Sequence, residues 1–157
     1  MKFLVTKELA YSSLLKNLVV GVCIALFFYF MLDVLLHGYI IGFTFEEMNS
    51  TLYGNAEEFI EPILIDSLLL QVHIDLFMSL LAVMMIASIY IRLFSTQKMT
   101  KWLVHTLFLL SLLSPMILIF AYLTSKIAVF IWIVCFVLGH LLAMIMTVMI
   151  VKKLLLK

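Results

Sequence analysis

The sequence predicts an all-α integral membrane protein, built as an up-down antiparallel four-helix bundle with both termini in the cytoplasm. Hydrophobic residues make up 66% of the chain and charged residues 12%, whereas soluble domains are about half apolar and about a quarter charged. The apolar residues fall into four stretches, each long enough to cross a bilayer. The connections after the second stretch are short, which favours antiparallel neighbours. We therefore treat residues 1–157 as a single transmembrane domain.

The first half of the chain is predicted to contain a surface helix, a span and an acidic loop. Residues 1–16 mix lysines with leucines and phenylalanine, which is typical of an amphipathic helix lying on the membrane. The first span covers about residues 18–36. The loop at 38–61 follows, with five glutamates and no Lys or Arg.

Two short helices are predicted inside this loop, separated at Gly54. Thr44 with Glu47, and Asn55 with Glu58, have the spacing of a capping box, in which each side chain accepts a hydrogen bond from the backbone N–H of the other residue. A glycine between them suits the break. The loop is therefore expected to be partly helical.

The second half of the chain is predicted to contain three spans, at about 63–91, 102–123 and 127–151. The third of the four spans contains Pro115, which lacks a backbone N–H and so predicts a kink. The last two spans are joined by a turn of only a few residues. This short turn predicts that they lie side by side and antiparallel.

The positive charges predict the orientation of the bundle. Of the ten Lys and Arg residues, nine lie before the first span, between the second and third, or after the fourth. Only Lys126 lies on the other side. Because positively charged loops stay in the cytoplasm, the acidic loop at 38–61 is expected on the opposite, outer side of the membrane. The membrane itself is most simply a bacterial inner membrane.

Ionisable side chains inside the spans are the first candidates for function, because the bilayer interior penalises them. Asp33 and His37 are four residues apart and share a helix face. Asp66 and His73 share a face of the second span, and Asp75 points almost the opposite way. If the first two spans pack through those faces, carboxylates and imidazoles converge in the outer third of the membrane. Such a set suits a divalent transition metal or a proton relay.

A haem site is a second hypothesis, because bundles bind cofactors with side chains from facing helices. His73 and His140 could reach similar depths if the helices tilt, and histidine is an axial ligand of b-type haem. Gly139 beside His140 would let a flat ring approach the backbone. One haem b between His73 and His140 is therefore the predicted cofactor under this hypothesis.

Three classes of function remain open on the sequence alone. The first is a b-type haem-binding electron-transfer subunit, the second a non-catalytic accessory or assembly subunit, and the third a cation or proton conduit with an acidic outer vestibule. All three place the chain in the lipid bilayer with a membrane-protein partner or a second copy. An enzyme acting alone is not favoured, and a net charge of +1 gives no argument for nucleic acid.

Overall fold

The computed structural model describes residues 13–156 and is all-helical in that range. Four helices are long: α2 (Ser13–Ile40), α4 (Ile65–Leu93), α5 (Met99–Thr124) and α6 (Lys126–Leu155); α3 (Phe45–Tyr53) is short. The predicted surface helix at 1–16 lies mostly outside the described residues. The prediction of an all-α protein with four long apolar helices is confirmed.

Each long helix is long and apolar enough to cross a membrane, as expected for an integral multi-pass membrane protein. The helices contain 28, 29, 26 and 30 residues, so at about 1.5 Å per residue each exceeds a hydrocarbon core of about 30 Å. They also extend a few residues beyond most of the predicted span limits. The prediction followed apolar residues, whereas helical hydrogen bonding continues into the polar ends.

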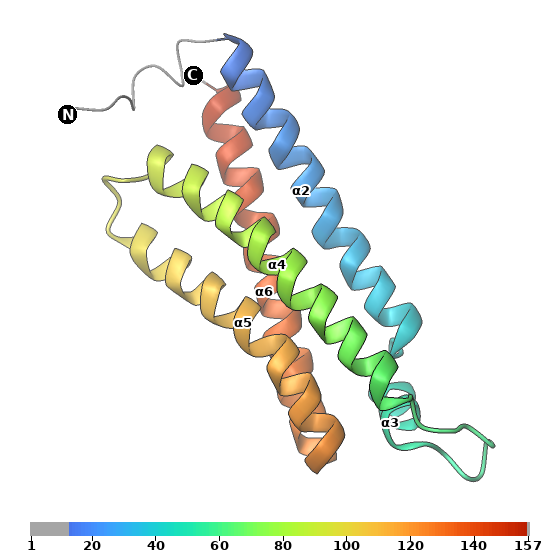
Figure 1. Ribbon diagram of the computed structural model, residues 1–157. Helices are drawn as coiled ribbons and strands as arrows, with labels where there is room; N and C mark the ends of the chain where they lie inside the picture. The colour runs from blue at the N-terminus through green and yellow to red at the C-terminus, as the bar shows by residue number, and fades with distance from the viewer. Residues whose placement is uncertain (1–12, 157) are drawn as a thin grey trace.

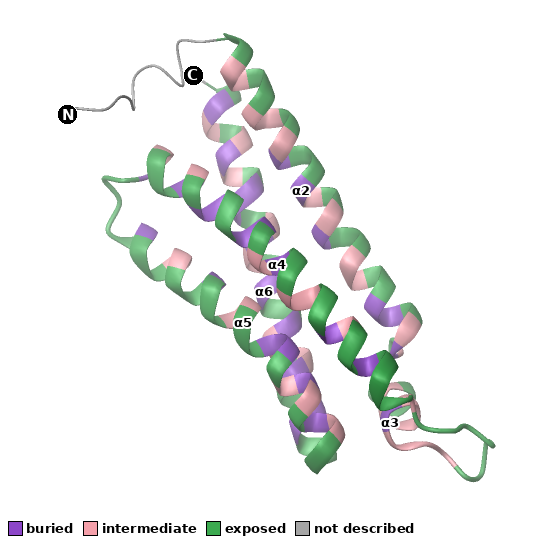
Figure 2. Ribbon diagram, viewed as in Figure 1, coloured by how far each residue is buried: buried purple, intermediate pink, exposed green. Residues whose placement is uncertain are grey.

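Helix α6 lies at the centre of the bundle. Helices α2 and α5 pack along it, α4 packs against α5 and more weakly against α6, and α2 makes few contacts with α4. Successive long helices run in opposite directions, so the start of α2 and the end of α6 lie at one end and α3 at the other (Figure 1). The buried positions of each helix face the interior, and the exposed positions form the outer surface (Figure 2).

The interior contains two apolar clusters at different heights. We call the first the α3-end cluster, and it contains Ile41, Leu52, Leu68, Val72, Leu118, Ala121, Ala128, Val129, Trp132 and Phe136. We call the second the far-end cluster, and it contains Cys23, Leu26, Phe30, Ala82, Val83, Ile86, Tyr90, Phe94, Leu107, Ala143, Met146, Ile150 and Leu154. Polar side chains lie between the two, and they form the candidate site.

Helix α3 has the predicted capping box, but the second predicted short helix is absent. The Thr44 hydroxyl accepts from the Glu47 N–H at 3.2 Å, and the Glu47 carboxylate accepts from the Thr44 N–H at 3.2 Å. Asn55 instead exchanges backbone hydrogen bonds with Ile60 and accepts from the Glu57 N–H through its side chain. The helix prediction at Asn55 is wrong because this side chain closes a turn rather than a helix.

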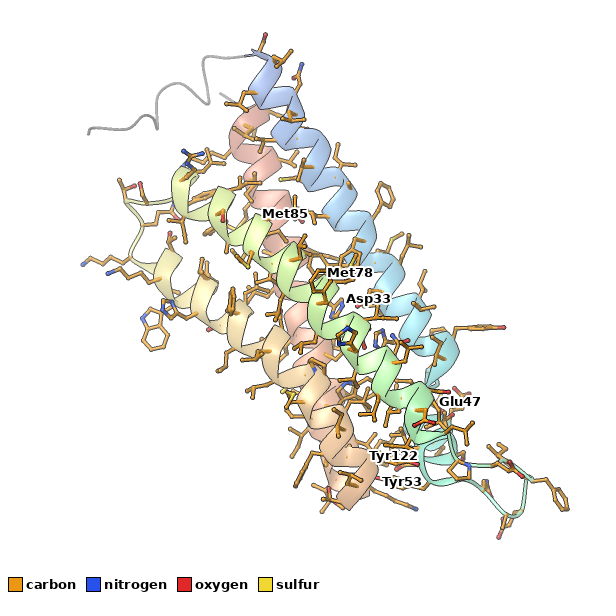
Figure 3. The ribbon with its side chains drawn as sticks, in the orientation of Figure 1. Asp33, Glu47, Tyr53, Met78, Met85 and Tyr122 are labelled. Carbon is orange, nitrogen blue, oxygen red and sulfur yellow. The ribbon has the colours of Figure 1, made fainter. Side chains whose placement is uncertain are left out.

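The acidic segment is anchored to the bundle rather than free in solvent. Leu52 is buried in the α3-end cluster, the Tyr53 hydroxyl donates to the Ala121 carbonyl at 2.6 Å, and the Tyr122 hydroxyl donates to the Ile63 carbonyl at 3.2 Å. Figure 3 shows Tyr53 and Tyr122 close together at this end of the molecule. Burial raises the pKa of Tyr53, which keeps its hydroxyl protonated and able to donate.

Replacing Tyr53 by phenylalanine is expected to lower the free energy of unfolding by about 0.5–1.5 kcal/mol, the net value of one hydrogen bond. The substitution removes only the hydroxyl that donates to Ala121. Denaturant titration in mild detergent measures the change. Tyr39→Phe is the control, because Tyr39 is 86% exposed; equal losses in the two variants would contradict the anchoring role.

Candidate functional site

Two aspartates and two histidines meet between the two apolar clusters. Asp33 and His37 come from α2, Asp75 from α4 and His140 from α6. Asp33 and His37 share a face of α2 because they are four residues apart. The imidazoles of His37 and His140 are buried, and the two carboxylate side chains are only 11–12% exposed. Figure 3 places Asp33 at the level of the middle of α4.

His37 is hydrogen-bonded through both ring nitrogens. Its Nδ1 lies 2.9 Å from the backbone carbonyl oxygen of Asp33, and its Nε2 lies 2.8 Å from Oδ2 of Asp75. A carbonyl oxygen only accepts, so Nδ1 carries a proton and donates it. The Nε2 contact then requires one further proton, held either by the imidazole or by the Asp75 carboxyl group. His37 and Asp75 therefore share a proton.

His140 repeats this arrangement on α6. Its Nδ1 lies 2.8 Å from the carbonyl oxygen of Phe136 and donates to it, and its Nε2 lies 2.7 Å from Oδ2 of Asp33. The same reasoning gives one proton shared between His140 and Asp33. The second imidazole–carboxyl pair thus joins α6 to α2, as the first joins α2 to α4.

The two pairs form one continuous chain of polar side chains. Gln71 donates to Oδ1 of Asp75 at 2.8 Å and begins it. Asp75 bonds His37, and Oδ1 of Asp33 lies 3.6 Å from Nδ1 of His37 on the other side of that ring. The other oxygen of Asp33 bonds His140. The order is Gln71, Asp75, His37, Asp33, His140, and it passes from α4 through α2 to α6.

Aromatic rings enclose both imidazoles. The ring centroid of Phe136 lies 4.5 Å from that of His37 and 4.1 Å from that of His140. Phe30 meets His140 edge-on at 5.5 Å, and Trp132 lies 6.3 Å from His37. Such surroundings lower the local dielectric, which strengthens satisfied hydrogen bonds and makes an unpaired polar group costly.

A small cavity of about 20 Å³ adjoins the chain and is lined by residues of all four long helices. A cavity of this size has room for about one water molecule when polar partners surround it. Ser111 and Pro115 of α5 both line it. Because Pro115 has no N–H, the Ser111 carbonyl lacks its usual helical partner and remains an acceptor for such a water.

Three of these groups have the chemistry to bind a cation. Ligand atoms of Asp33, His37 and Asp75 all lie within 4.8 Å of one another. Two ligands on one transition-metal ion are about 3.0–3.4 Å apart, given bonds of about 2.1 Å. Within this set, Nε2 of His37 lies 2.8 Å from Oδ2 of Asp75, and Nδ1 of the same ring lies 3.6 Å from Oδ1 of Asp33. The first distance is a hydrogen-bond length, and the two carboxylates meet different nitrogens of the ring, which cannot both bind one ion. The arrangement therefore fits a proton chain better than a coordination sphere.

The structure brings together only part of the predicted cation or proton site. Asp33, His37 and Asp75 are in contact, whereas Asp66 and His73 are exposed on the opposite side of α4. The buried face of α4 is the one that carries Asp75. That face contains Leu68, Val72, Asp75, Ser79, Ala82 and Ile86, at three- and four-residue spacing. Large apolar residues also occupy the exposed sides of α4, so the spacing alone gave no signal that selects Asp75 over His73.

His140 has a partner that the sequence did not indicate. The sequence leaves two roles open for His140, a haem ligand with His73 or an interhelical hydrogen bond. In the structure its two nitrogens bond Phe136 of the same helix and Asp33 of α2. A Cβ added to the adjacent Gly139 would lie 3.4 Å from Cβ of Leu110, so this glycine lies against α5. The haem between His73 and His140 stays a prediction, and no contact described here supports it.

The chain matches no protein-family model, and neither the curated proteins nor the solved structures give a significant match. The functional interpretation therefore rests on the geometry of the polar chain and on the membrane character of the four long helices.

Proposed function

We propose that this protein is an integral membrane proton relay, acting as a half-channel from the α3 end of the bundle to the middle of the bilayer. The observation that carries the proposal is the chain of two imidazole–carboxyl pairs, in which both nitrogens of His37 and of His140 are bonded to oxygen. Ionisable groups at membrane depth are characteristic of proton relays.

The chain can pass a proton in balanced steps. A protonated Asp75 gives its proton to Nε2 of His37, which becomes an imidazolium. Nδ1 of that ring then gives its proton to Oδ1 of Asp33, 3.6 Å away, after a small rotation from the backbone carbonyl. As Oδ1 of Asp33 takes this proton, the proton on Oδ2 passes to Nε2 of His140, whose ring becomes an imidazolium until a proton leaves it. A rotation of the Asp33 carboxyl group then returns its remaining proton to Oδ2. A flip of the His37 ring restores the starting tautomer.

The relay stops near the middle of the membrane. His140 is fourteen residues beyond Lys126, about 21 Å along a helix of 30 residues. The side chains packed beyond it belong to the far-end cluster, which is apolar. We therefore infer that a partner membrane protein takes the proton from His140, which combines the conduit and accessory-subunit hypotheses.

The α3 end supplies the entrance in this proposal, and protons reach the chain past the partly exposed Gln71 that begins it rather than through the apolar α3-end cluster. All five glutamates of the acidic segment are exposed there, and uncompensated negative charge raises the local concentration of protons and other cations. The distribution of Lys and Arg supports an orientation with this end outside and both termini in the cytoplasm. A bacterial inner membrane is the setting we propose.

Infrared spectroscopy of the protein in lipid bilayers tests the relay. We expect a pH-dependent absorption from protonated carboxyl groups that is reduced in both Asp33→Asn and Asp75→Asn. Asparagine keeps the size of the side chain and its capacity for hydrogen bonding. Asp66→Asn is the matched control, because Asp66 is exposed on the same helix as Asp75. Equal titration in all three variants would reject the relay.

Proton flux into liposomes tests the half-channel separately. The chain alone should give no sustained proton current, because the side chains of residues 13–156 that pack beyond His140 form the apolar far-end cluster. A sustained current abolished by Asp75→Asn would contradict the half-channel and establish a complete path instead.

A further inference from the structure

A second feature lies at the end of the bundle opposite α3 and is independent of the relay. A groove of about 440 Å³ runs between α2 and α6. It is lined by Cys23, Ile24, Phe27, Thr147, Val148, Val151 and Lys152. The volume is about that of one fatty acyl chain.

The groove offers an apolar surface along its length. Cys23 and Thr147 form its buried floor, with 0% and 1% exposure, and Ile24 and Val148 form its rim, with 48% and 53% exposure. The Thr147 hydroxyl donates to the Met144 carbonyl, so it presents no unsatisfied donor. An alkyl chain therefore meets only apolar surface there.

One end of the groove is basic. Lys152 lines it within one turn of the end of α6, and Lys16 lies on α2 seven residues before Cys23, two turns along the same face. Neither side chain has a hydrogen bond or ion pair with residues 13–156. Lys153 differs, since its ammonium donates to the Leu93 carbonyl and lies 4.1 Å from the Phe94 ring centroid.

The protein supplies no described carboxylate at this end to balance these charges. Within residues 13–156, every Asp and Glu lies between Asp33 and Asp75, in the site or toward α3. Arg92, Lys98 and Lys101 add further positive charge at the same end. Among the described residues, no carboxylate therefore competes with an external anion for these lysines.

We propose that the groove binds an anionic phospholipid, with one acyl chain along Ile24 and Val148 and the phosphate beside Lys152 and Lys16. Basic pockets between transmembrane helices on the cytoplasmic side are known binding sites for anionic lipid headgroups. The apolar groove holds the alkyl chain and the lysines select the charge, so a zwitterionic lipid with the same chains binds less tightly.

Native mass spectrometry of the whole protein with phosphatidylglycerol and with phosphatidylcholine of identical acyl chains tests this site. Wild-type protein should retain phosphatidylglycerol at least several-fold better. Lys152→Gln should remove most of that preference, and Val148→Trp, which fills the exposed rim of the groove, should reduce binding of both lipids. Circular dichroism confirms that each variant is folded.

Lys101→Gln is the matched control, because Lys101 is an exposed cation at the same end that does not line the groove. It should keep the preference for phosphatidylglycerol. An equal loss in Lys101→Gln and Lys152→Gln would show that charge attracts lipid diffusely over the surface and would overturn the site. Unchanged binding in Val148→Trp would overturn the placement of the acyl chain.

Discussion

Replacing Asp75 by alanine is expected to lower the free energy of unfolding by about 3–5 kcal/mol, the cost of removing one partner from a buried ion pair. The substitution leaves Nε2 of His37 and the amide of Gln71 without their acceptor. It also removes the one side-chain hydrogen bond described between α2 and α4. Reversible unfolding in detergent, followed by circular dichroism, measures the loss.

Two controls separate the effect of losing the His37–Asp75 pair from the effect of shortening a side chain on α4. Asp75→Asn keeps a hydrogen-bonding side chain of the same size and should cost less than Asp75→Ala. Asp66→Ala removes an exposed carboxylate of the same helix, and should change the free energy by no more than about 0.5 kcal/mol. An equal effect of the alanine substitutions at 66 and 75 would contradict the pairing.

A double substitution then separates the contribution of this pair to stability from its contribution to proton transfer. His37→Leu combined with Asp75→Leu replaces the pair by apolar side chains, and such replacements of buried pairs are often neutral or stabilising. We expect stability close to that of the wild type but no carboxyl titration from this pair in the infrared spectrum. A double variant that kept the full titration would show that protons do not pass through Asp75.

Replacing Trp132 by alanine is expected to lower the free energy of unfolding by about 3–5 kcal/mol, because it leaves a cavity in the interior. Trp132 is 2% exposed in the α3-end cluster, and its ring centroid lies 6.3 Å from that of His37. Its removal should admit water to the imidazole. Exchange of the carboxyl protons with deuterium, followed by infrared spectroscopy, should therefore become faster.

Trp102→Ala provides the comparison, because Trp102 is 73% exposed at the start of α5. It should change neither the exchange rate nor the stability by much. A destabilised Trp132→Ala variant with unchanged exchange would mean that Trp132 is structural only and that protons enter by another route.

Local features were predictable where the deciding forces are local. The four long helices follow from their apolar length, and α3 follows from Thr44 and Glu47, whose side chains cap the helix they start. The same spacing at Asn55 and Glu58 also predicted a helix, but the structure has a turn there. An Asn side chain can bond the backbone two residues on, as it does to Glu57, and this turn competes with a helix.

The sequence by itself determined that this is a multi-pass helical membrane protein, and that Asp33 and His37 share one face of a helix. It could also show that Asp75 and His73 lie on opposite sides of α4. It could not determine which of them faces inward, because helical periodicity sets relative directions within one helix and not its rotation in the bundle.

Only the tertiary structure decided that rotation. Packing of the α4 face that carries Leu68, Val72 and Ser79 turns Asp75 inward and leaves His73 exposed. Packing of α2 along α6 brings His140 to Asp33, 107 residues away in the chain. These contacts join separate helices, and the free energy that selects them comes from burying whole helix faces together and pairing polar groups that lipid cannot solvate.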